Sequence, residues 1–281
     1  MSIAVQNINT TRSSDGSMMH YMVPGLIILV ATTGLYLTGH VLGFQQLRAH
    51  SQALGVLSEW TPRLAIGFTV DIYLTVLSVA FGTCIGAVGG YATMSQSALL
   101  RRISWWLIQF FRNTPGLVLL FAFAFTLPFQ MQLGDVIIPL PAEAKVIMCF
   151  SFKIAANVAE IVRGAVNSLH VGQWEGGLSI GLSRVQTFRL VILPQCLPRM
   201  LAPWMNVVAL FFTAVPIASL VGIYDAVTYA GLALSSEGSS DLIMPIYLYV
   251  LAWFFGIVFF LQGLTKHFEI RSRLIGRSTE D

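Results

Sequence analysis

Long apolar runs with few charges restrict the fold of this chain more than any other feature. A helix needs about 20 mostly apolar residues to cross the hydrocarbon core of a bilayer. Six runs approach this length, and they lie near residues 22–44, 64–93, 115–133, 144–163, 200–222 and 243–265. Only 10% of the 281 residues are charged, compared with about 25% in soluble domains. The sequence therefore predicts a helical integral membrane protein.

Lysine and arginine are unevenly distributed among the connections between these runs. The segments 94–114, 163–199 and 266–281 carry three, four and four of them, and one lies before the first run. The connections on the opposite side carry only two. Because basic residues favour the cytoplasmic side of a membrane, we expect both termini and the segment 163–199 to lie in the cytoplasm.

The composition also excludes several classes of function. The net charge of +3 does not come from a basic patch interleaved with aromatic residues, so we expect no nucleic-acid partner. The three cysteines form no C-x-x-C pair and the five histidines do not cluster, so we expect no disulfide framework, catalytic site or metal site. No G-x-x-x-x-G-K-[ST] motif is present, so any nucleotide hydrolysis must belong to another subunit.

A polar, glycine-rich loop at residues 172–182 separates two apolar runs. A membrane protein with few charges has little reason to keep such a loop in water unless another protein docks there. We expect residues 173–180 to form two helical turns and Gly181 to end them in the left-handed conformation. Gly176 and Gly177 inside this helix each cost about 1 kcal/mol relative to alanine. The helix is therefore expected to order fully only on docking.

A second short helix is expected directly after the first. Ser183 stands three residues before Gln186, which is the spacing of a capping box. Proline disfavours helical conformation in the residue before it. Leu193 precedes Pro194, so we expect this second helix to end near Ile192. The first helix is expected to present three side chains close together, namely Trp174, Glu175 and Leu178. An amphipathic hairpin lying on the lipid surface is the alternative.

The loop resembles the cytoplasmic EAA loop of the permease subunits of ABC importers. That pattern is Glu-Ala-Ala, three residues, Gly, nine residues, Ile, any residue, and Leu-Pro. The residues that match it are Glu175, Gly181, Leu193 and Pro194. The residues that depart from it are Gly176, Gly177 and Val191. Two upstream segments, 110–115 and 159–164, extend the resemblance to the polar amino-acid branch of this family, over roughly residues 60–270.

The resemblance implies an all-α membrane protein with the type I ABC importer permease fold. About six transmembrane helices are expected, as a five-helix core with one extra N-terminal helix and a cytoplasmic coupling helix. The implied layout is a disordered tail at 1–20, an extra span and outer linker at 21–63, a permease domain at 64–265 and a basic cytoplasmic tail at 266–281. Within the permease domain, the EAA loop occupies residues 164–198.

The resemblance also implies partners and a location. Two ATP-binding cassette subunits would bind ATP and Mg, and their docking would involve Trp174, Glu175, Gly176, Gly177, Gly181 and Pro194. A second permease subunit, identical or paralogous, would complete the path for a small polar solute, expected to be an amino acid or an amino-acid derivative. A periplasmic or other extracytoplasmic solute-binding protein would deliver that solute. The chain would be a multi-pass protein of the bacterial inner membrane, surrounded by lipid, with no enzymatic activity.

Lys153 is the single residue with the most functional character, because a charge near the middle of a span costs about 2.5–3.5 kcal/mol. Asp71 lies at a comparable depth, so one interpretation is an Asp71–Lys153 ion pair. The other is that Lys153 and Asn157, one turn deeper, face a water-filled path and meet a substrate carboxylate. Thr213 begins a segment where the family commonly has a Lys-Asp pair, which implies a changed pore lining. Asp225 occupies the position of the family's usual glutamate.

Three further patterns have structural interpretations. Gly82, Gly86 and Gly90 form a smooth stripe for close helix packing, either within the chain or between subunits. Glu160 and Arg163 are spaced for an intrahelical ion pair. Thr114 followed by proline predicts the start of a helix.

Two other functional classes are weighed against the importer. An ion-coupled secondary transporter would usually show repeated halves, and no such repeat is visible. A membrane-embedded enzyme would need paired carboxylates or a Ser/His pair at matching depth, and no such pair is visible either.

Overall fold

The computed structural model describes residues 44–133 and 136–277, and within them the side chains of residues 53–132 and 137–268. The expected tail at 1–20 and all but the last residue of the first expected span lie outside these ranges. The chain divides into two compact units, residues 1–58 and 59–281. The described part of the first unit is the beginning of one long helix, and the second unit holds every other element considered below.

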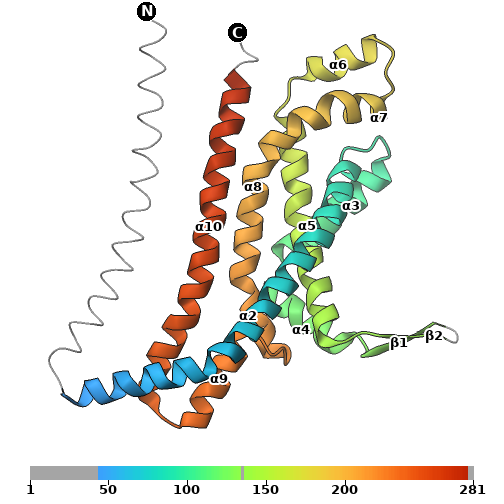
Figure 1. The fold of residues 1–281 in the computed structure, drawn as a ribbon. Helices are drawn as coiled ribbons and strands as arrows, with labels where there is room; N and C mark the ends of the chain where they lie inside the picture. Colours follow the sequence, from blue (N-terminus) through green and yellow to red (C-terminus); the bar gives the residue numbers. More distant parts are fainter. Residues whose placement is uncertain (1–43, 134–135, 278–281) are drawn as a thin grey trace, which may run out of the picture. The chain divides into compact units, whose positions relative to one another are not determined.

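Helices make up most of the described residues. They are α2 (Phe44–Ala92), α3 (Ala98–Asn113), α4 (Gly116–Thr126), α5 (Ala142–Asn167), α6 (Val171–Ser179), α7 (Arg184–Thr187), α8 (Leu193–Ala214), α9 (Ala226–Glu237) and α10 (Ile243–Arg277). A π-helical turn, η1 (Phe188–Ile192), joins α7 to α8, and the 3₁₀ segments η2 (Val215–Val221) and η3 (Ser240–Leu242) flank α9. Figure 1 shows α6 and α7 at one end of α5 and α8, with α9 toward the other end.

Three helical stretches of the described residues are long and apolar enough to cross a membrane. They are Ala53–Ala92, Arg184–Val221 and Ser240–Phe268. They confirm the expected spans near 64–93, 200–222 and 243–265. The expected span near 144–163 forms helix α5, but this helix lies outside the apolar group because it carries five charged residues, Glu143, Lys145, Lys153, Glu160 and Arg163. Helix α2 also continues upstream through the segment expected to be an outer linker.

The expected span near 115–133 is wrong as a single helix. Helix α4 has 11 residues, so at 1.5 Å per residue it covers only about half of a bilayer core. It stops before Leu127, which is extended because Pro128 follows it. The chain then forms an antiparallel hairpin of β1 (Gln130–Leu133) and β2 (Val136–Pro139), a small exception to the all-α prediction. Helices α3 and α4 make one apolar pair bent by 104°.

The glycine stripe of α2 packs against α5 within the chain. A Cβ atom added at Gly82, Gly86 or Gly90 would lie 2.7 Å from the Cβ of Ile154, Val158 or Val162, respectively. Real Cβ atoms do not approach this closely, so only glycine permits the observed spacing between the two helices. The hydrophobic core of the second unit lies along this contact, and α5 contributes more of its buried residues than any other helix.

Candidate functional site

Helix α6 forms over Val171–Ser179 without a docked partner, contrary to the expectation that it orders fully only on docking, and a complete glycine cap ends it. Gly181 has φ 85°. Its N–H donates to the Leu178 carbonyl at 3.0 Å, and the Leu182 N–H donates to the Gly177 carbonyl at 3.2 Å. These two hydrogen bonds define a Schellman motif, which satisfies the last carbonyls of the helix. The prediction of two turns followed by a left-handed glycine is confirmed.

The capping box at the start of α7 is also confirmed. The Ser183 N–H donates to Gln186 Oε1 at 2.8 Å, and the Gln186 N–H donates to Ser183 Oγ at 3.3 Å. The box fixes the turn between α6 and α7 through local contacts alone.

The expected end of the second helix near Ile192 is wrong. The π turn η1 carries the chain without a break from α7 into α8, and the Leu193 N–H donates to the Phe188 carbonyl five residues back. Pro194 is the second residue of α8 and directly follows the π turn. The cytoplasmic helix predicted from the loop is therefore continuous with a membrane helix.

The two glycines of α6 differ in what surrounds them. A Cβ at Gly177 would lie 2.9 Å from Thr187 Oγ1 and 3.1 Å from Thr187 Cβ. A Cβ at Gly176 would have no atom within 4 Å. Gly177 therefore permits close contact between α6 and α7, whereas Gly176 faces open space.

Trp174 points into the base of the loop. Its ring stacks on Phe188 with 6.4 Å between centroids, and Phe188 lies 4.6 Å from the ring of Tyr91 at the end of α2. Trp174 also packs against the small buried cluster that holds Ile192 and Cys196. This position differs from the expectation that Trp174 is presented outward with Glu175 and Leu178. Trp174 instead anchors the loop to α2 and α8.

The outer face of the loop combines one carboxylate with apolar side chains. Glu175 is exposed, and Leu178 and Ile180 are 42% and 75% exposed. Other large apolar side chains exposed on α6, α7 and η1 are Val171, Val185 and Leu190. Exposed apolar groups of this kind around a charge are typical of a protein contact surface.

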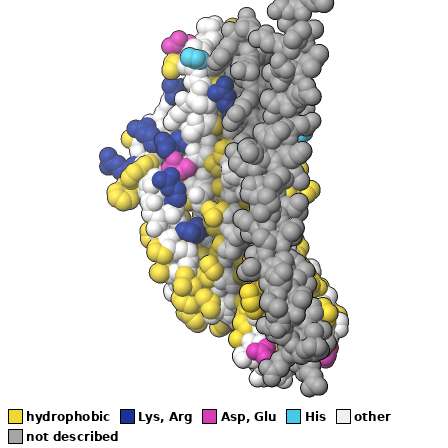
Figure 2. Space-filling model, turned by 90° about the vertical axis from the view of Figure 1, so that its left-hand side faces the viewer, with side chains coloured by type: hydrophobic (Ala, Val, Ile, Leu, Met, Phe, Trp, Pro, Cys, Tyr) yellow, Lys and Arg dark blue, Asp and Glu magenta, His cyan; other side chains and the backbone are white. Residues whose placement is uncertain are grey.

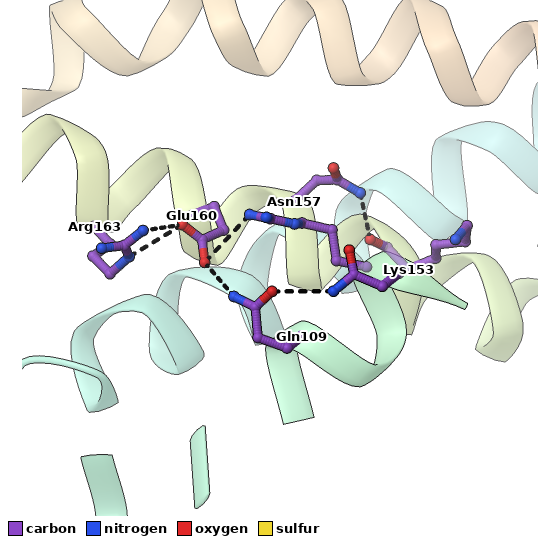
Figure 3. Close-up of polar contacts among 7 residues, drawn as sticks. Gln109, Lys153, Asn157, Glu160 and Arg163 are labelled. Atoms are coloured by element: carbon purple, nitrogen blue, oxygen red, sulfur yellow. Dashed lines mark hydrogen bonds and ion pairs between the residues drawn. The ribbon is translucent and has the colours of Figure 1, made fainter. Parts of the chain in front are cut away.

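Lys153 does not pair with Asp71. Its Nζ donates to the Thr114 carbonyl at 2.6 Å and to the Phe111 carbonyl at 3.3 Å. Asp71 is fully buried elsewhere, and its Oδ2 accepts from the Ala226 N–H at 3.2 Å. The ion-pair interpretation is therefore wrong, because the side chains of Lys153 and Asp71 form hydrogen bonds with main-chain groups instead of with each other. Asn157 donates to the Lys153 carbonyl of its own helix at 2.8 Å (Figure 3).

A second lysine of α5, which the sequence interpretation missed, has an equivalent role. Lys145 is only 2% exposed, and its Nζ donates to the carbonyls of Leu127 at 2.7 Å and Ala124 at 2.9 Å. Lys145 thus binds the C-terminal carbonyls of α4, and Lys153 binds those of α3. Cations are favourable at helix C-termini, so these carbonyls offset much of the cost of burying the two charges.

The two upstream segments of the family resemblance meet at Glu160 (Figure 3). Arg163 donates its Nε to Glu160 Oε2 at 3.1 Å, which confirms the intrahelical pair. From α3, Gln109 Nε2 lies 3.2 Å and Arg112 Nη1 3.4 Å from Glu160 Oε1. Thr114, expected to start a helix, instead ends α3, and its hydroxyl donates to the Phe110 carbonyl.

The remaining candidate positions lie apart from these groups. Thr213 is exposed, and its hydroxyl donates to the Leu210 carbonyl at 2.8 Å. Asp225 caps α9 by accepting from the Thr228 N–H at 2.7 Å. In the described ranges, no group of three or more His, Cys, Asp or Glu side chains is placed to hold a metal ion.

A family model described as "Binding-protein-dependent transport system inner membrane component" matches residues 82–274, well over half of the chain. The chain belongs to this family. Its members are transport subunits rather than enzymes. Membership places the chain in the inner membrane, and it implies ATP-hydrolysing and solute-binding partners, with nucleotide bound by subunits other than this one. The resemblance drawn from the EAA loop is thereby confirmed.

Similar proteins include permeases from two bacteria. The chain is 36% identical to the "Probable amino-acid ABC transporter permease protein YckA" of Bacillus subtilis over 172 residues, which cover 61% of this chain and 74% of YckA. It is 39% identical to the "Glutamine transport system permease protein GlnP" of Escherichia coli K12 over 146 residues, or 52% of this chain and 64% of GlnP. It is 29% identical to the "L-cystine transport system permease protein TcyB" of Bacillus subtilis over 214 residues, or 75% of this chain and 87% of TcyB.

Solved structures show the same fold. An amino acid ABC transporter crystallised with histidines superposes with a TM-score of 0.67 at 26% identity, over 76% of this chain and 96% of the other. A chain of the MetNI methionine ABC transporter superposes with a TM-score of 0.54 at 18% identity, over 73% and 95%. The fold is that of a type I ABC importer permease, as the resemblance implied.

Proposed function

We propose that this chain forms half of the path through which an ATP-driven importer carries an amino acid or an amino-acid derivative. The observation that carries the proposal is the continuity of α7 with α8 through η1, because it gives a docked partner a rigid connection to a membrane helix. The amino-acid cargo is supported by the names of the related permeases, YckA, GlnP and TcyB.

In this proposal the transporter has two cytoplasmic ATP-binding cassette subunits, and one of them docks on the outer face of α6. Glu175 supplies the charge of the contact, and Leu178 and Ile180 supply apolar area. Trp174 holds the base of the loop against α8, and Gly177 keeps α6 close to α7. Gly181 turns the chain from α6 toward α7, and Pro194 lies where α8 begins. Closure of the ATPases on ATP and Mg would then tilt α8.

Lys153 is the proposed contact for the carboxylate of the cargo. A lysine has three N–H donors, and the carbonyls of Phe111 and Thr114 engage two of them. Lys153 is only half-buried, so its third donor can face a path. Asn157 and Thr213 are further lining candidates. Asp71 is now the weakest candidate, because it is buried against Ala226.

The complete transporter would contain a second permease subunit, identical or paralogous, and an extracytoplasmic solute-binding protein. Both termini and the α6–α7 loop would lie in the cytoplasm, as the distribution of basic residues indicates. Residues 64–265 would form the permease domain, preceded by a tail at 1–20 and an additional segment at 21–63, and followed by a basic tail.

The proposal is tested by transport in proteoliposomes. The chain is reconstituted with its cognate ATPase and solute-binding protein, and uptake of labelled amino acids is measured. We expect uptake that needs internal ATP, is blocked by vanadate and survives an uncoupler. Uptake that proceeds without ATP and collapses with the uncoupler would instead identify an ion-coupled transporter.

A further inference from the structure

Helix α3 packs on the rest of the chain through only a narrow stripe. Ser104 and Ile108 are its buried residues, and Ile108 contacts Ala156 and Ala159 of α5. Phe111 is half-buried and its ring stacks on Phe152 of α5, with 5.0 Å between centroids. Seven large apolar side chains of the helix are exposed, and they are Leu99, Leu100, Ile103, Trp105, Trp106, Leu107 and Phe110. Because α3 is bent by 104° from α4, it crosses the direction of its neighbour instead of continuing it. The surface of α3 therefore faces outward from the described residues of this chain.

Unpaired arginines gather at the beginning of this helix. Arg101 and Arg102 are both exposed, and Arg101 Nη1 donates only to the Ser95 carbonyl, at 2.9 Å. Arg184 of α7 joins them, since its Nε and Nη1 lie 3.2 Å from the Gln96 amide oxygen in the orientation that satisfies both groups. Figure 2 shows that Lys and Arg side chains gather in the upper part of one face of the molecule, with hydrophobic side chains below them.

No carboxylate of the described residues neutralises these three arginines. The ion pairs formed by those residues join Glu160 to Arg112 and Arg163, farther along α3 and on α5. Arg101 and Arg102 also lie near the N-terminus of α3, the end of a helix where cations are unfavourable. Their position therefore does not stabilise the isolated helix. An external anion at this end would both pair with the arginines and offset their unfavourable interaction with the helix N-terminus.

Each of the two arginines has a tryptophan four residues later. Arg101 and Trp105, and likewise Arg102 and Trp106, are neighbours on the helix surface. Tryptophan is enriched where a protein crosses the headgroup level of a membrane, and basic residues beside an apolar helix face attract anionic lipid. Trp106 is 63% exposed, so its ring is available to acyl chains.

We propose that α3 is a binding surface for anionic phospholipid headgroups. Three arginines, Arg101, Arg102 and Arg184, bind the headgroups, and Trp105 and Trp106 lie in the headgroup layer. A second copy of the chain is a poorer occupant, because a twofold contact at this face would set the arginines against one another. The lipid site is independent of the cargo, so it stands or falls separately from the transport proposal.

The test measures which lipid stays bound to the full chain. The protein is purified in detergent and supplied with equal parts of phosphatidylglycerol and phosphatidylcholine, and retained lipids are counted by native mass spectrometry. We expect preferential retention of phosphatidylglycerol, reduced about fivefold for each arginine replaced among Arg101→Gln, Arg102→Gln and Arg184→Gln. Arg63→Gln is the control, because it removes the same charge from α2 at a position far along the chain from α3. This variant should leave the lipid preference unchanged.

Two further readouts place the lipid at α3. Brominated phosphatidylglycerol should quench the tryptophan fluorescence of the wild type more than that of Trp106→Phe. An unchanged lipid preference in the triple arginine variant would overturn the proposal. So would a disulfide between two copies carrying Trp106→Cys that the parent chain does not form, since this result would assign the face to a subunit contact.

Discussion

At the scale of single residues, two adjacent glycines in α6 have different reasons to be there. Gly177 lies against Thr187, so a larger residue forces α6 away from α7, whereas Gly176 has open space beside it. From the sequence the two positions are equivalent departures from the same motif. Their difference depends on the α6–α7 contact, which no local pattern specifies.

This difference leads to opposite effects of the same substitution. We expect Gly176→Ala to stabilise α6 by about 0.4–1 kcal/mol, because alanine restricts the unfolded chain and favours helix. Gly177→Ala should instead loosen α6, because its Cβ meets the Thr187 side chain. Hydrogen exchange of the amides in α6 measures both. Equal protection in the two variants would contradict this account of the loop.

The two lysines of α5, Lys145 and Lys153, show that a cationic side chain inside the protein can be satisfied without an acidic side chain as its partner. Their partners are carbonyls at the ends of α3 and α4, which are distant in sequence and lie near the lysines only in the folded chain. The sequence indicated that Lys153 needs a partner, but its pattern of charges pointed to Asp71. Main-chain acceptors leave no signal in the side-chain sequence, so Lys145 was missed for the same reason.

A double-mutant cycle tests the corrected assignment. We expect Lys153→Met to cost about 1–3 kcal/mol, because it leaves the Thr114 and Phe111 carbonyls unsatisfied. Asp71→Asn should add independently, with a coupling energy below about 0.5 kcal/mol. The measurement is unfolding in mixed detergent micelles. A coupling well above that value would restore the ion pair.

At the scale of elements, local signals correctly predicted the C-terminal end of α6 and the start of α7. Gly181 and the Ser183–Gln186 box act through neighbouring residues, so the sequence contains all the information needed. The α7–α8 junction was mispredicted, because the rule for residues before proline does not anticipate a π turn. The prediction of a single span at 115–133 was wrong for a similar reason. The apolar composition continues past Pro128, but helix α4 ends before it.

The π turn η1 should set the direction in which the loop faces. Removing one residue from 188–192 would convert it to an ordinary α turn and rotate α6 and α7 by about 100° about the axis of α8. We expect this deletion to leave the protein inserted in the membrane and to abolish ATP-dependent uptake. Membrane fractionation and transport assays measure the two properties. Normal uptake by the deletion variant would show that the orientation of the loop is not used.

At the scale of the whole molecule, residues distant in sequence converge into one mechanical connection. Tyr91 of α2, Trp174 of α6 and Phe188 of η1 form an aromatic cluster at the base of the loop, and α8 continues from that base toward the membrane. The family and its fold could be predicted from the sequence, because the EAA loop spacing and the apolar runs are both visible there. The aromatic cluster could not, since it joins three separate elements.

The central claim is that the outer face of α6 receives an ATPase subunit, and direct association between the two proteins tests it most simply. The purified chain is mixed with its cognate ATPase, and binding is measured for the wild type, Glu175→Ala and a deletion of residues 174–180. Glu237→Ala, an exposed acidic residue at the end of α9, is the control. We expect the control to bind normally, Glu175→Ala to bind weakly and the deletion not to bind. Normal binding by the deletion variant would contradict the account.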